Sequence, residues 1–402
     1  MTTSIESTDN AVLAEDNPID TATNTAAETT IEAPVAAPTP PNPIRAKDRD
    51  GVIQSLRAGV VPRAGQHLIQ VGRAREIQTL VNDMDRLAEG GSTFRVVVGE
   101  YGAGKTFFLN LLRTVALEKK LVVANADLNP DRRLHASGGQ AKSLYTELVR
   151  NMTTRSKPEG GALPGIVEKF VSSAQAVAKA TGITTDAAIH QKLEQLKELV
   201  NGYDFADVIA AYYKGFSEGN DQLKSDAIRW LRGEFSTKTQ AREALGVRTI
   251  VEDATVYDQL KLLARFVRLA GFGGLIINLD EMVNLYKLSH TQARNANYEQ
   301  ILRILNDSLQ GSSEGLGFIL GGTPEFLTDT RRGLYSYPAL QSRLAQNAFA
   351  KDELLGLTGP VISLVSLTPE DFFVLQQKIR HVFASGNTAQ YLVPDDGIVA
   401  FM

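Results

Sequence analysis

The fold of this 402-residue chain is decided by the segment Phe94-Arg-Val-Val-Val-Gly99-Glu-Tyr-Gly-Ala-Gly-Lys105-Thr106. Phe94–Val98 is a short run of apolar and β-branched residues, typical of a strand buried in a parallel sheet. The residues that follow match the pattern G-x-x-x-x-G-K-[ST], and residues 106–116 continue as a helix-forming stretch. A chance glycine-rich turn could match this pattern, but a phosphate-binding loop requires the strand before it and the helix after it. The segment therefore predicts an open, parallel α/β sheet that binds a nucleoside triphosphate.

The parts of this loop have separate chemical uses. Glycines allow successive backbone N–H groups to converge on phosphate oxygens, and the following helix adds the positive end of its dipole. Lys105 is expected to reach the β- and γ-phosphates, and the Thr106 hydroxyl is expected to bind Mg²⁺. ATP and Mg²⁺ are therefore the predicted cofactors. The predicted nucleotide contacts of the loop are Gly99, Glu100, Tyr101, Gly102, Ala103, Gly104, Lys105, Thr106 and Phe107.

An apolar loop, His67-Leu-Ile-Gln-Val-Gly-Arg73, precedes the first predicted strand. A loop at this position can form a wall for the adenine ring, and we expect Val71 and Gly72 to contribute to it, together with Ile69. The alternative is that these residues only pack the helix that follows, which is predicted over residues 73–87 from its apolar periodicity.

A second buried strand is predicted over Leu275–Leu279, and Asp280 and Glu281 follow it directly. Asp280 is expected to hold Mg²⁺, directly or through water. Glu281 is expected to orient and deprotonate the water that attacks the γ-phosphate. The two acids could instead cap the next helix, and this use is compatible with catalysis.

Two further catalytic candidates lie downstream. Thr323 follows the predicted strand Gly317–Leu320 and is expected to sense the γ-phosphate or the attacking water, although Gly-Gly-Thr-Pro is also ordinary turn chemistry. Arg343 is our candidate for an arginine that completes the site of a neighbouring subunit. Arg331 and Arg332 are the other candidates for this role. The alternative is that these arginines are solvated or salt-bridged and have no catalytic role.

The chain divides into three predicted regions. Residues 1–45 read as a disordered, acidic tail rich in Pro, Thr and Ala, and residues 46–355 as the ATPase core. A helical insertion of about residues 140–270, with loops at Lys157–Pro164 and Gly215–Asn220, interrupts this core after a strand predicted over Leu121–Ala126. Residues 356–402 are predicted to hold a lid and the start of a winged-helix region. A first helix is predicted over residues 47–60.

The aromatic residues of the insertion have no assignable chemistry. Trp230 is expected in a helix core rather than on a base-stacking surface. Tyr203, Tyr212 and Tyr213, near Lys214, are likewise expected to be packed, although they could stack on nucleic acid.

Composition excludes several classes of site. The chain has no Cys, which excludes disulfides and thiolate metal sites, and its five His residues show no paired ligand spacing. No leader pattern and no apolar run of about 20 residues occurs, so we predict a cytoplasmic protein without a membrane partner. The net charge of −4 is concentrated in the tail, and the rest of the chain neither indicates nor forbids a nucleic-acid partner.

The order of these motifs resembles the AAA+ P-loop ATPases, in the group of replication initiators and helicase loaders. A closer resemblance, over nearly the whole predicted folded region, is to the BREX phage-defence ATP-binding proteins of the BrxD kind. The segments that carry it are Leu56-Arg-Ala-Gly-Val-Val-Pro-Arg63, Asn278-Leu-Asp-Glu281, Asn284-Leu-Tyr-Lys287, Asn297-Tyr-Glu299, Ile301-Leu-Arg-Ile-Leu-Asn-Asp307, Gly321-Gly-Thr-Pro-Glu-Phe326 and Arg332-Gly-Leu-Tyr-Ser-Tyr337.

The resemblance implies a cytoplasmic, antiviral protein that binds ATP and acts beside other phage-defence proteins, helicases among them. A homo-oligomer is expected from the candidate arginine, and DNA is a candidate partner. The resemblance also implies a lid helix, which Leu367-Thr-Pro-Glu-Asp-Phe-Phe373 would begin, and a winged helix, which is expected to need more residues than residues 356–402 supply. The leading hypothesis is an ATP-hydrolysing machine that couples its nucleotide cycle to DNA or to a DNA-acting partner. The alternative is a nucleotide-gated switch or scaffold with little turnover.

Overall fold

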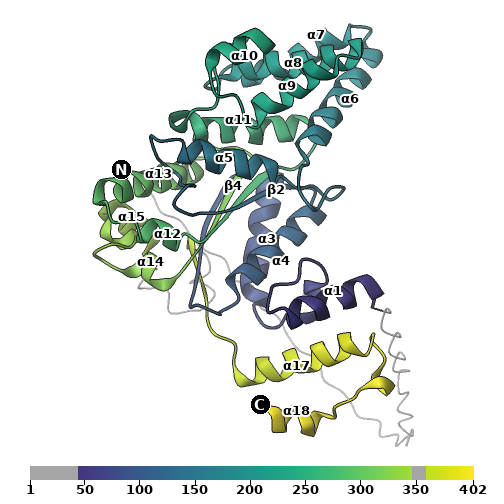
Figure 1. The fold of residues 1–402 in the computed structure, drawn as a ribbon, viewed down its shortest axis with the longest axis vertical. Coiled ribbons are helices and arrows are strands. Elements are labelled where there is room, and N and C mark those ends of the chain that lie inside the picture. Colours follow the sequence, from purple (N-terminus) through teal and green to yellow (C-terminus); the bar gives the residue numbers. More distant parts are fainter. Residues whose placement is uncertain (1–43, 346–358) are drawn as a thin grey trace, which may run out of the picture. The chain divides into compact units, whose positions relative to one another are not determined.

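The computed structural model of the protein describes residues 44–345 and 359–402 (Figure 1). The predicted acidic tail, residues 1–45, lies outside the described residues except for its last two. Residues 346–355 of the predicted core also lie outside them. None of the helices in the described ranges combines the length and the apolar composition that a bilayer crossing requires.

One parallel sheet forms the centre of the structure (Figure 1). Within the described residues its five strands pair in the order β2-β3-β4-β1-β5. Their bounds are Thr93–Gly99 for β1, Val122–Asp127 for β2, Leu275–Asp280 for β3, Leu316–Gly322 for β4 and Val361–Leu364 for β5. Because the strands are parallel, their carboxyl ends meet at one edge, called here the carboxyl edge, and their amino ends meet at the opposite amino edge.

Helices precede, connect and follow these strands. Around β1 lie α1 (Ala46–Arg57), α2 (Gln66–Ile69), α3 (Ala74–Ala88) and α4 (Lys105–Glu118). Between β2 and β3 lie α5 (Gln140–Arg150), α6 (Leu163–Thr181), α7 (Thr185–Leu193), η1 (Glu194–Leu196), α8 (Gly202–Glu218), α9 (Asp221–Leu231), α10 (Lys238–Leu245), η2 (Asp253–Thr255) and α11 (Val256–Leu269). The remaining helices are α12 (Val283–Tyr286), α13 (Thr291–Gln310), α14 (Pro324–Thr328), η3 (Leu334–Ser336), α15 (Pro338–Leu344), α17 (Pro369–Phe383), η4 (Thr388–Gln390) and α18 (Asp395–Phe401).

Helices cover both faces of the sheet. Val96 and Val98 of β1 belong to an apolar cluster with α5, α11 and α13, whereas Val97 belongs to a second cluster with α3 and α4. Successive residues of a strand point to opposite faces, so burial of both faces favours mostly apolar strands, and the polar exceptions, such as Arg95 in β1, are paired inside the protein. This explains why all four predicted strands form where the sequence places them, each within two residues of its predicted ends.

Two helix predictions need correction at their ends. The first helix ends at Arg57 rather than residue 60, and Gly59 adopts a left-handed backbone with φ of 68°. A loop was predicted over Gly215–Asn220, but α8 continues to Glu218. A Cβ on Gly215 would lie 2.9 Å from the carbonyl oxygen of Asn220, so the glycine allows a close approach of backbone and does not end the helix.

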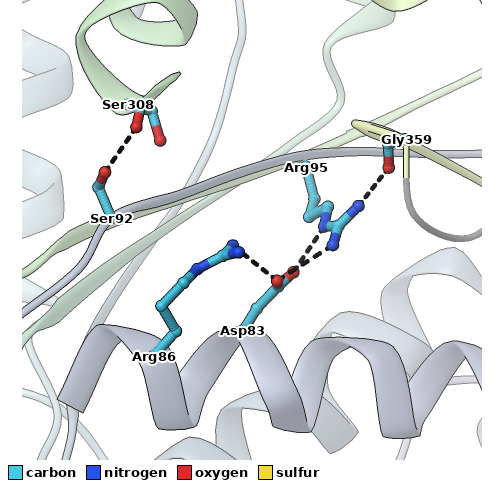
Figure 2. A network of polar contacts seen from close by, with 6 residues as sticks. All are labelled: Asp83, Arg86, Ser92, Arg95, Ser308 and Gly359. Carbon is cyan, nitrogen blue, oxygen red and sulfur yellow. Dashed lines mark hydrogen bonds and ion pairs between the residues drawn. The ribbon is translucent and has the colours of Figure 1, made fainter. Parts of the chain in front are cut away.

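The structure adds β5, which no sequence pattern predicted. It pairs with β1, so the sheet continues to Leu364, past residue 355 where the core was expected to end. Just before β5, the carbonyl of Gly359 accepts a hydrogen bond from Arg95 Nη1 (Figure 2). Arg95 also binds the carboxylate of Asp83 in α3 through Nε at 2.5 Å and Nη2 at 3.0 Å. A buried ion pair at the amino edge therefore joins α3, β1 and the start of β5.

The helices between β2 and β3 form an aromatic core of their own, continuous with one face of the sheet. The ring of Phe205 lies 6.2 Å from that of Trp230 and 5.4 Å from that of Phe266. Trp230 is 1% exposed and donates from Nε1 to the carbonyl of Thr249, which confirms the prediction of a core role. Tyr212 is also buried as expected, but Tyr203 is 66% exposed, so the packing prediction was wrong for that residue.

The predicted lid helix forms as α17, with Thr368 and Asp371 in a capping box at its start. It packs against the N-terminal helices through an apolar cluster whose buried members are Val52, Ile69 and Val382. After α17, the described residues contain only η4 and α18 as regular elements. The winged-helix region therefore stays a prediction.

Candidate nucleotide-binding site

The loop between β1 and α4 has the backbone of a phosphate cradle. Gly102 and Gly104 have φ of 84° and 83°, which a residue with a side chain rarely adopts. A Cβ added at either position would have no atom within 4 Å, so conformation rather than space requires glycine there. The open space on the loop and the free N–H groups at the start of α4 fit a phosphate.

Lys105 lies against this loop. Its Nζ donates to the carbonyl oxygens of Gly99 and Glu100, at 2.7 and 2.9 Å. These bonds keep the ammonium group at the loop, where phosphate oxygens can take the place of the carbonyls. Tyr101, a predicted contact, is 99% exposed at the tip, so its side chain contributes no wall to the cradle.

Two predicted metal ligands meet although 174 residues separate them. Thr106 Oγ1, at the start of α4, donates to Asp280 Oδ2, at the end of β3, at 2.9 Å. A hydroxyl and a carboxylate oxygen are ligands that suit Mg²⁺. Among the described residues no group of three or more His, Asp or Glu side chains could hold a metal by itself. Thr106 and Asp280 therefore fit a Mg²⁺ ion that also takes oxygen ligands from phosphate and water.

Glu281 follows in an unusual backbone conformation. Its φ is 57°, in the left-handed region, and its N–H donates to Asp280 Oδ1 at 2.8 Å. Its carbonyl accepts hydrogen bonds from the backbone N–H and the Nδ2 of Asn284. The next helix, α12, has Met282 at its N-cap with no side-chain cap bond, so neither acid caps it. The turn instead leaves the exposed Glu281 at the carboxyl edge.

Thr323 follows β4, which lies between β3 and β1. The structure therefore places it at the carboxyl edge between the phosphate loop and the Asp280–Glu281 turn. Its Oγ1 accepts a hydrogen bond from the N–H of Phe326 at 3.4 Å as the N-cap of α14. The capping role that turn chemistry suggested is thus present, and the sensor role stays a prediction.

The three candidate arginines differ in their surroundings. Arg332 donates to the carbonyl of Leu288 at 3.1 Å and lies over the ring of Tyr286. Arg343 is exposed in the last turn of α15, with one bond to the carbonyl of Ala339, and Arg331 is also exposed. The surroundings of Arg332 favour a structural use, whereas Arg343 and Arg331 are accessible to another molecule.

Beside the phosphate loop lies an apolar cavity of about 350 Å³. The predicted adenine-loop residue Val71 lines it, with Ile69 and, from the phosphate-loop segment, Ala103, Gly104 and Phe107. Leu375 and Ile379 of α17 form another part of the wall. Gly72 does not line it, because the position of its missing Cβ faces Asp371 at 3.6 Å.

Arg73 links the parts of this cavity. Its Nη2 donates to the carbonyl of Ala103 in the phosphate loop and to that of Val365, just after β5. Lys378 of α17 donates to the carbonyl of Gln70. The cavity is therefore bounded by residues 69–73, the phosphate loop and α17, and hydrogen bonds join residues 70 and 73 to the other two segments.

Sequence reasoning missed Asp127, the last residue of β2. It stands opposite Asp280 in the parallel register of β2 and β3. Asp127 is exposed, but partial desolvation by the surrounding protein and then the charge of Asp280 raise the pKa of its carboxyl above the ordinary value. The strand predicted over Leu121–Ala126 ended one residue before this acid, so the signal was present in the sequence. The position of Asp127 next to Asp280 follows only from the pairing of β2 with β3, which the sequence did not show.

Comparison with known proteins gives one match. The model of the family described as BREX system ATP-binding protein BrxC/D matches residues 44–402. No curated protein and no solved structure matches the chain.

Proposed function

The chain belongs to the BREX system ATP-binding protein BrxC/D family, and from that premise we propose that it hydrolyses ATP with Mg²⁺ at the carboxyl edge of its sheet. The nucleotide cycle would drive a change in DNA or in a DNA-acting partner, such as a helicase, during phage defence. We further propose that it acts in the cytoplasm, as an AAA+ ATPase beside other defence proteins.

One observation carries this proposal: the Thr106 hydroxyl meets the Asp280 carboxylate at 2.9 Å, directly beside Glu281. Binding alone requires the cradle and the metal ligands. Hydrolysis requires in addition a group that takes a proton from water, and Glu281 supplies a carboxylate next to the metal ligand. The exposed position of Glu281 leaves its oxygens accessible to a water molecule.

The residues divide the work as follows. The loop N–H groups and Lys105 bind and orient the phosphates, and Thr106 and Asp280 hold the ion. When bound, Mg²⁺ neutralises charge on the β- and γ-phosphates. Glu281 accepts the proton of the attacking water. Thr323, located between these groups, donates its hydroxyl hydrogen to the γ-phosphate or to the water. The apolar cavity at Val71 and Phe107 holds the adenine ring by contact with its faces.

We propose that the protein works as a homo-oligomer in which Arg343 reaches the site of a neighbouring subunit. Arg343 is exposed, and its Nη1 donates to the carbonyl of Ala339 within its own helix. An accessible guanidinium can stabilise the charge that develops on the transferred phosphoryl group. Mass measurement with and without ATP, for the wild-type protein and Arg343→Ala, tests this step. We expect the variant to assemble but to turn over slowly.

The function is tested by ATP hydrolysis measured alone, with single-stranded DNA, with duplex DNA and with the other defence proteins. We expect turnover in at least one of these conditions, and Glu281→Gln is expected to lower kcat by about 10²-fold or more while ATP still binds. Turnover that persists in Glu281→Gln would contradict the assigned base. Tight ATP binding without turnover in any condition would instead support the nucleotide-gated switch.

A further inference from the structure

We propose that Asn284 is a positioning residue for Glu281, and that it connects the hydrolytic turn to the loop that leads into the helical insertion. This inference rests on the proposed hydrolysis at Glu281. The proposed role of Asn284 is to hold the backbone of Glu281 in place. Through Asn284, a movement of the helical insertion would also change the position of Glu281.

The backbone of Glu281 needs external support. A φ of 57° is unfavourable for a residue with a side chain, and it persists only where surrounding bonds hold it. Asn284 supplies two such bonds to the Glu281 carbonyl, from its N–H at 2.9 Å and from its Nδ2 at 3.2 Å. The next residue, Met282, is fully buried and donates its N–H to the carbonyl of Gly321 in β4.

The same Asn284 amide reaches a second segment. Its Nδ2 donates to the carbonyl of Leu128 at 2.8 Å, directly after the end of β2. The N–H of Leu128 in turn donates to the carbonyl of Asp280 at 3.1 Å. Each of the two segments, the turn after β3 and the chain after β2, therefore donates a hydrogen bond to the other. A shift of Leu128 would break or bend the bonds that hold Glu281.

Residues 128–139, called here the β2–α5 loop, are fixed along their length by side chains from distant segments. Asn297 of α13, which is fully buried, accepts from the N–H of His135 at 2.9 Å and donates to its carbonyl at 3.0 Å. Asp253 accepts from the N–H groups of Gly139 at 2.7 Å and Lys142 at 2.8 Å.

Asp253 connects two distant parts of the insertion. It is the first residue of η2, which leads into α11, whereas Gly139 and Lys142 lie where the chain enters α5. The segment that leads into α11 is therefore bonded to the start of the insertion and to the end of the β2–α5 loop. A partner that displaces the insertion would move this loop, and Asn284 is the side chain through which the movement reaches Glu281.

The first test compares Asn284→Asp with wild type. Aspartate has nearly the same size but lacks the Nδ2 donor, so the two hydrogen bonds from the Asn284 side chain, to Leu128 and to Glu281, are lost. We expect kcat to fall about tenfold or more, because small misplacement of a catalytic group is costly, while KM and the affinity for a non-hydrolysable ATP analogue change little. Asn295→Asp, at an exposed position of α13, is the matched control and should behave as wild type.

A merely structural role of Asn284 is distinguished by a double variant. If Asn284 acts through Glu281, adding Asn284→Asp to Glu281→Gln lowers kcat no further than Glu281→Gln alone. If Asn284→Asp only destabilised the fold, it would instead lower kcat by the same factor in wild type and in Glu281→Gln. Additive losses, or a wild-type kcat in the single variant, would overturn the proposal and leave ATP hydrolysis itself unaffected.

Hydrogen exchange of the β2–α5 loop provides a readout that does not depend on turnover. We expect the ATP analogue with Mg²⁺ to change the exchange of amides in residues 128–139 of wild type, and this change to disappear in Asn284→Asp. If wild type shows no hydrolysis in any condition, the proposed function fails, but loss of the exchange response still supports the connection. An unchanged exchange response in the variant contradicts it.

Discussion

The two edges of the sheet place charged residues in opposite situations. At the amino edge, Asp83 and Arg95 are buried, with side chains 5% and 9% exposed, and their charged atoms bind each other (Figure 2). Arg86 adds a second partner to Asp83, and Gly359 accepts from Arg95. At the carboxyl edge, Thr106 and Glu281 are exposed, Asp280 is half-buried, and Gly104 and Glu281 have left-handed backbones.

The difference shows how one sheet separates stability from function. The charged groups of Asp83 and Arg95 are bonded within the protein itself, so they can join elements but cannot bind a ligand without breaking those bonds. The carboxyl edge keeps strained backbone and accessible oxygens, which is the usual cost of a binding site. Substitutions at the amino edge should therefore change folding, and substitutions at the carboxyl edge should change nucleotide chemistry. The predictions below test this separation.

The largest effect is expected from Asp83→Ala at the amino edge. The change removes the Asp83 carboxylate from the buried Arg95 guanidinium, and breaking a buried pair in this way costs about 3–5 kcal/mol of unfolding free energy. Denaturant unfolding measures the loss, and ATP affinity of the protein that remains folded should be unchanged. The double variant Asp83→Leu with Arg95→Leu should recover much of the stability. Equal instability of the single and double variants would contradict the ion-pair explanation.

A somewhat smaller effect is expected from Lys105→Ala at the carboxyl edge. A hydrogen bond from a charged donor contributes about 1.5–3 kcal/mol, so ATP affinity should fall by roughly 10- to 100-fold. The carbonyls of Gly99 and Glu100 can bind water in its absence, so unfolding free energy should change by less than about 0.5 kcal/mol. Calorimetric titration with ATP measures the affinity, and denaturant unfolding measures the unfolding free energy. A large loss of stability with unchanged affinity would remove the distinction between the edges.

Strand β4 carries a matched pair of glycines that compares the edges directly. A Cβ on Gly321 would lie 2.6 Å from Asp280 Oδ1, whereas a Cβ on Gly317 would lie 2.8 Å from Thr93 Cγ2. Both Gly→Ala variants should lose about 1–3 kcal/mol of stability through overpacking. Only Gly321→Ala should displace Asp280 from Thr106 and weaken Mg²⁺-dependent ATP binding. Similar binding defects in both variants would show that strain in the strand, rather than the carboxylate, controls the site.

The smallest effect is expected from Asp127→Asn. Because the folded-state pKa of Asp127 is raised, the ionised carboxylate destabilises the folded protein, and this penalty develops as pH rises from the unfolded pKa through the folded one. The variant lacks the penalty, so its Tm should exceed that of wild type by about 1 °C near neutral pH. The difference should shrink as pH falls below that window. A variant that is less stable at neutral pH would indicate that the charge is needed in the fold.

Local patterns predicted much of this structure because their causes are local. The run Phe94–Val98 is apolar apart from Arg95, as expected of a strand that is covered on both faces, and Gly102 and Gly104 are glycines because of their own backbone angles. The acids after Leu275–Leu279 were placed correctly at a strand end. In contrast, no sequence pattern predicted the four-residue β5, and the role of Asp127 could not be assigned until β2 was known to lie beside β3.

The sequence by itself determined the phosphate loop, the strand that ends in Asp280 and Glu281, and the helical character of residues 140–270, since each depends on residues adjacent in the chain. Only the tertiary structure decided the strand order, the bond between Thr106 and Asp280, and the pairing of Asp83 with Arg95. It also decided that Asn284 joins Glu281 to Leu128. The physical reason is that a parallel strand needs a long crossover before it meets its neighbour. The spacing of residues along the chain therefore does not show which strand ends lie together.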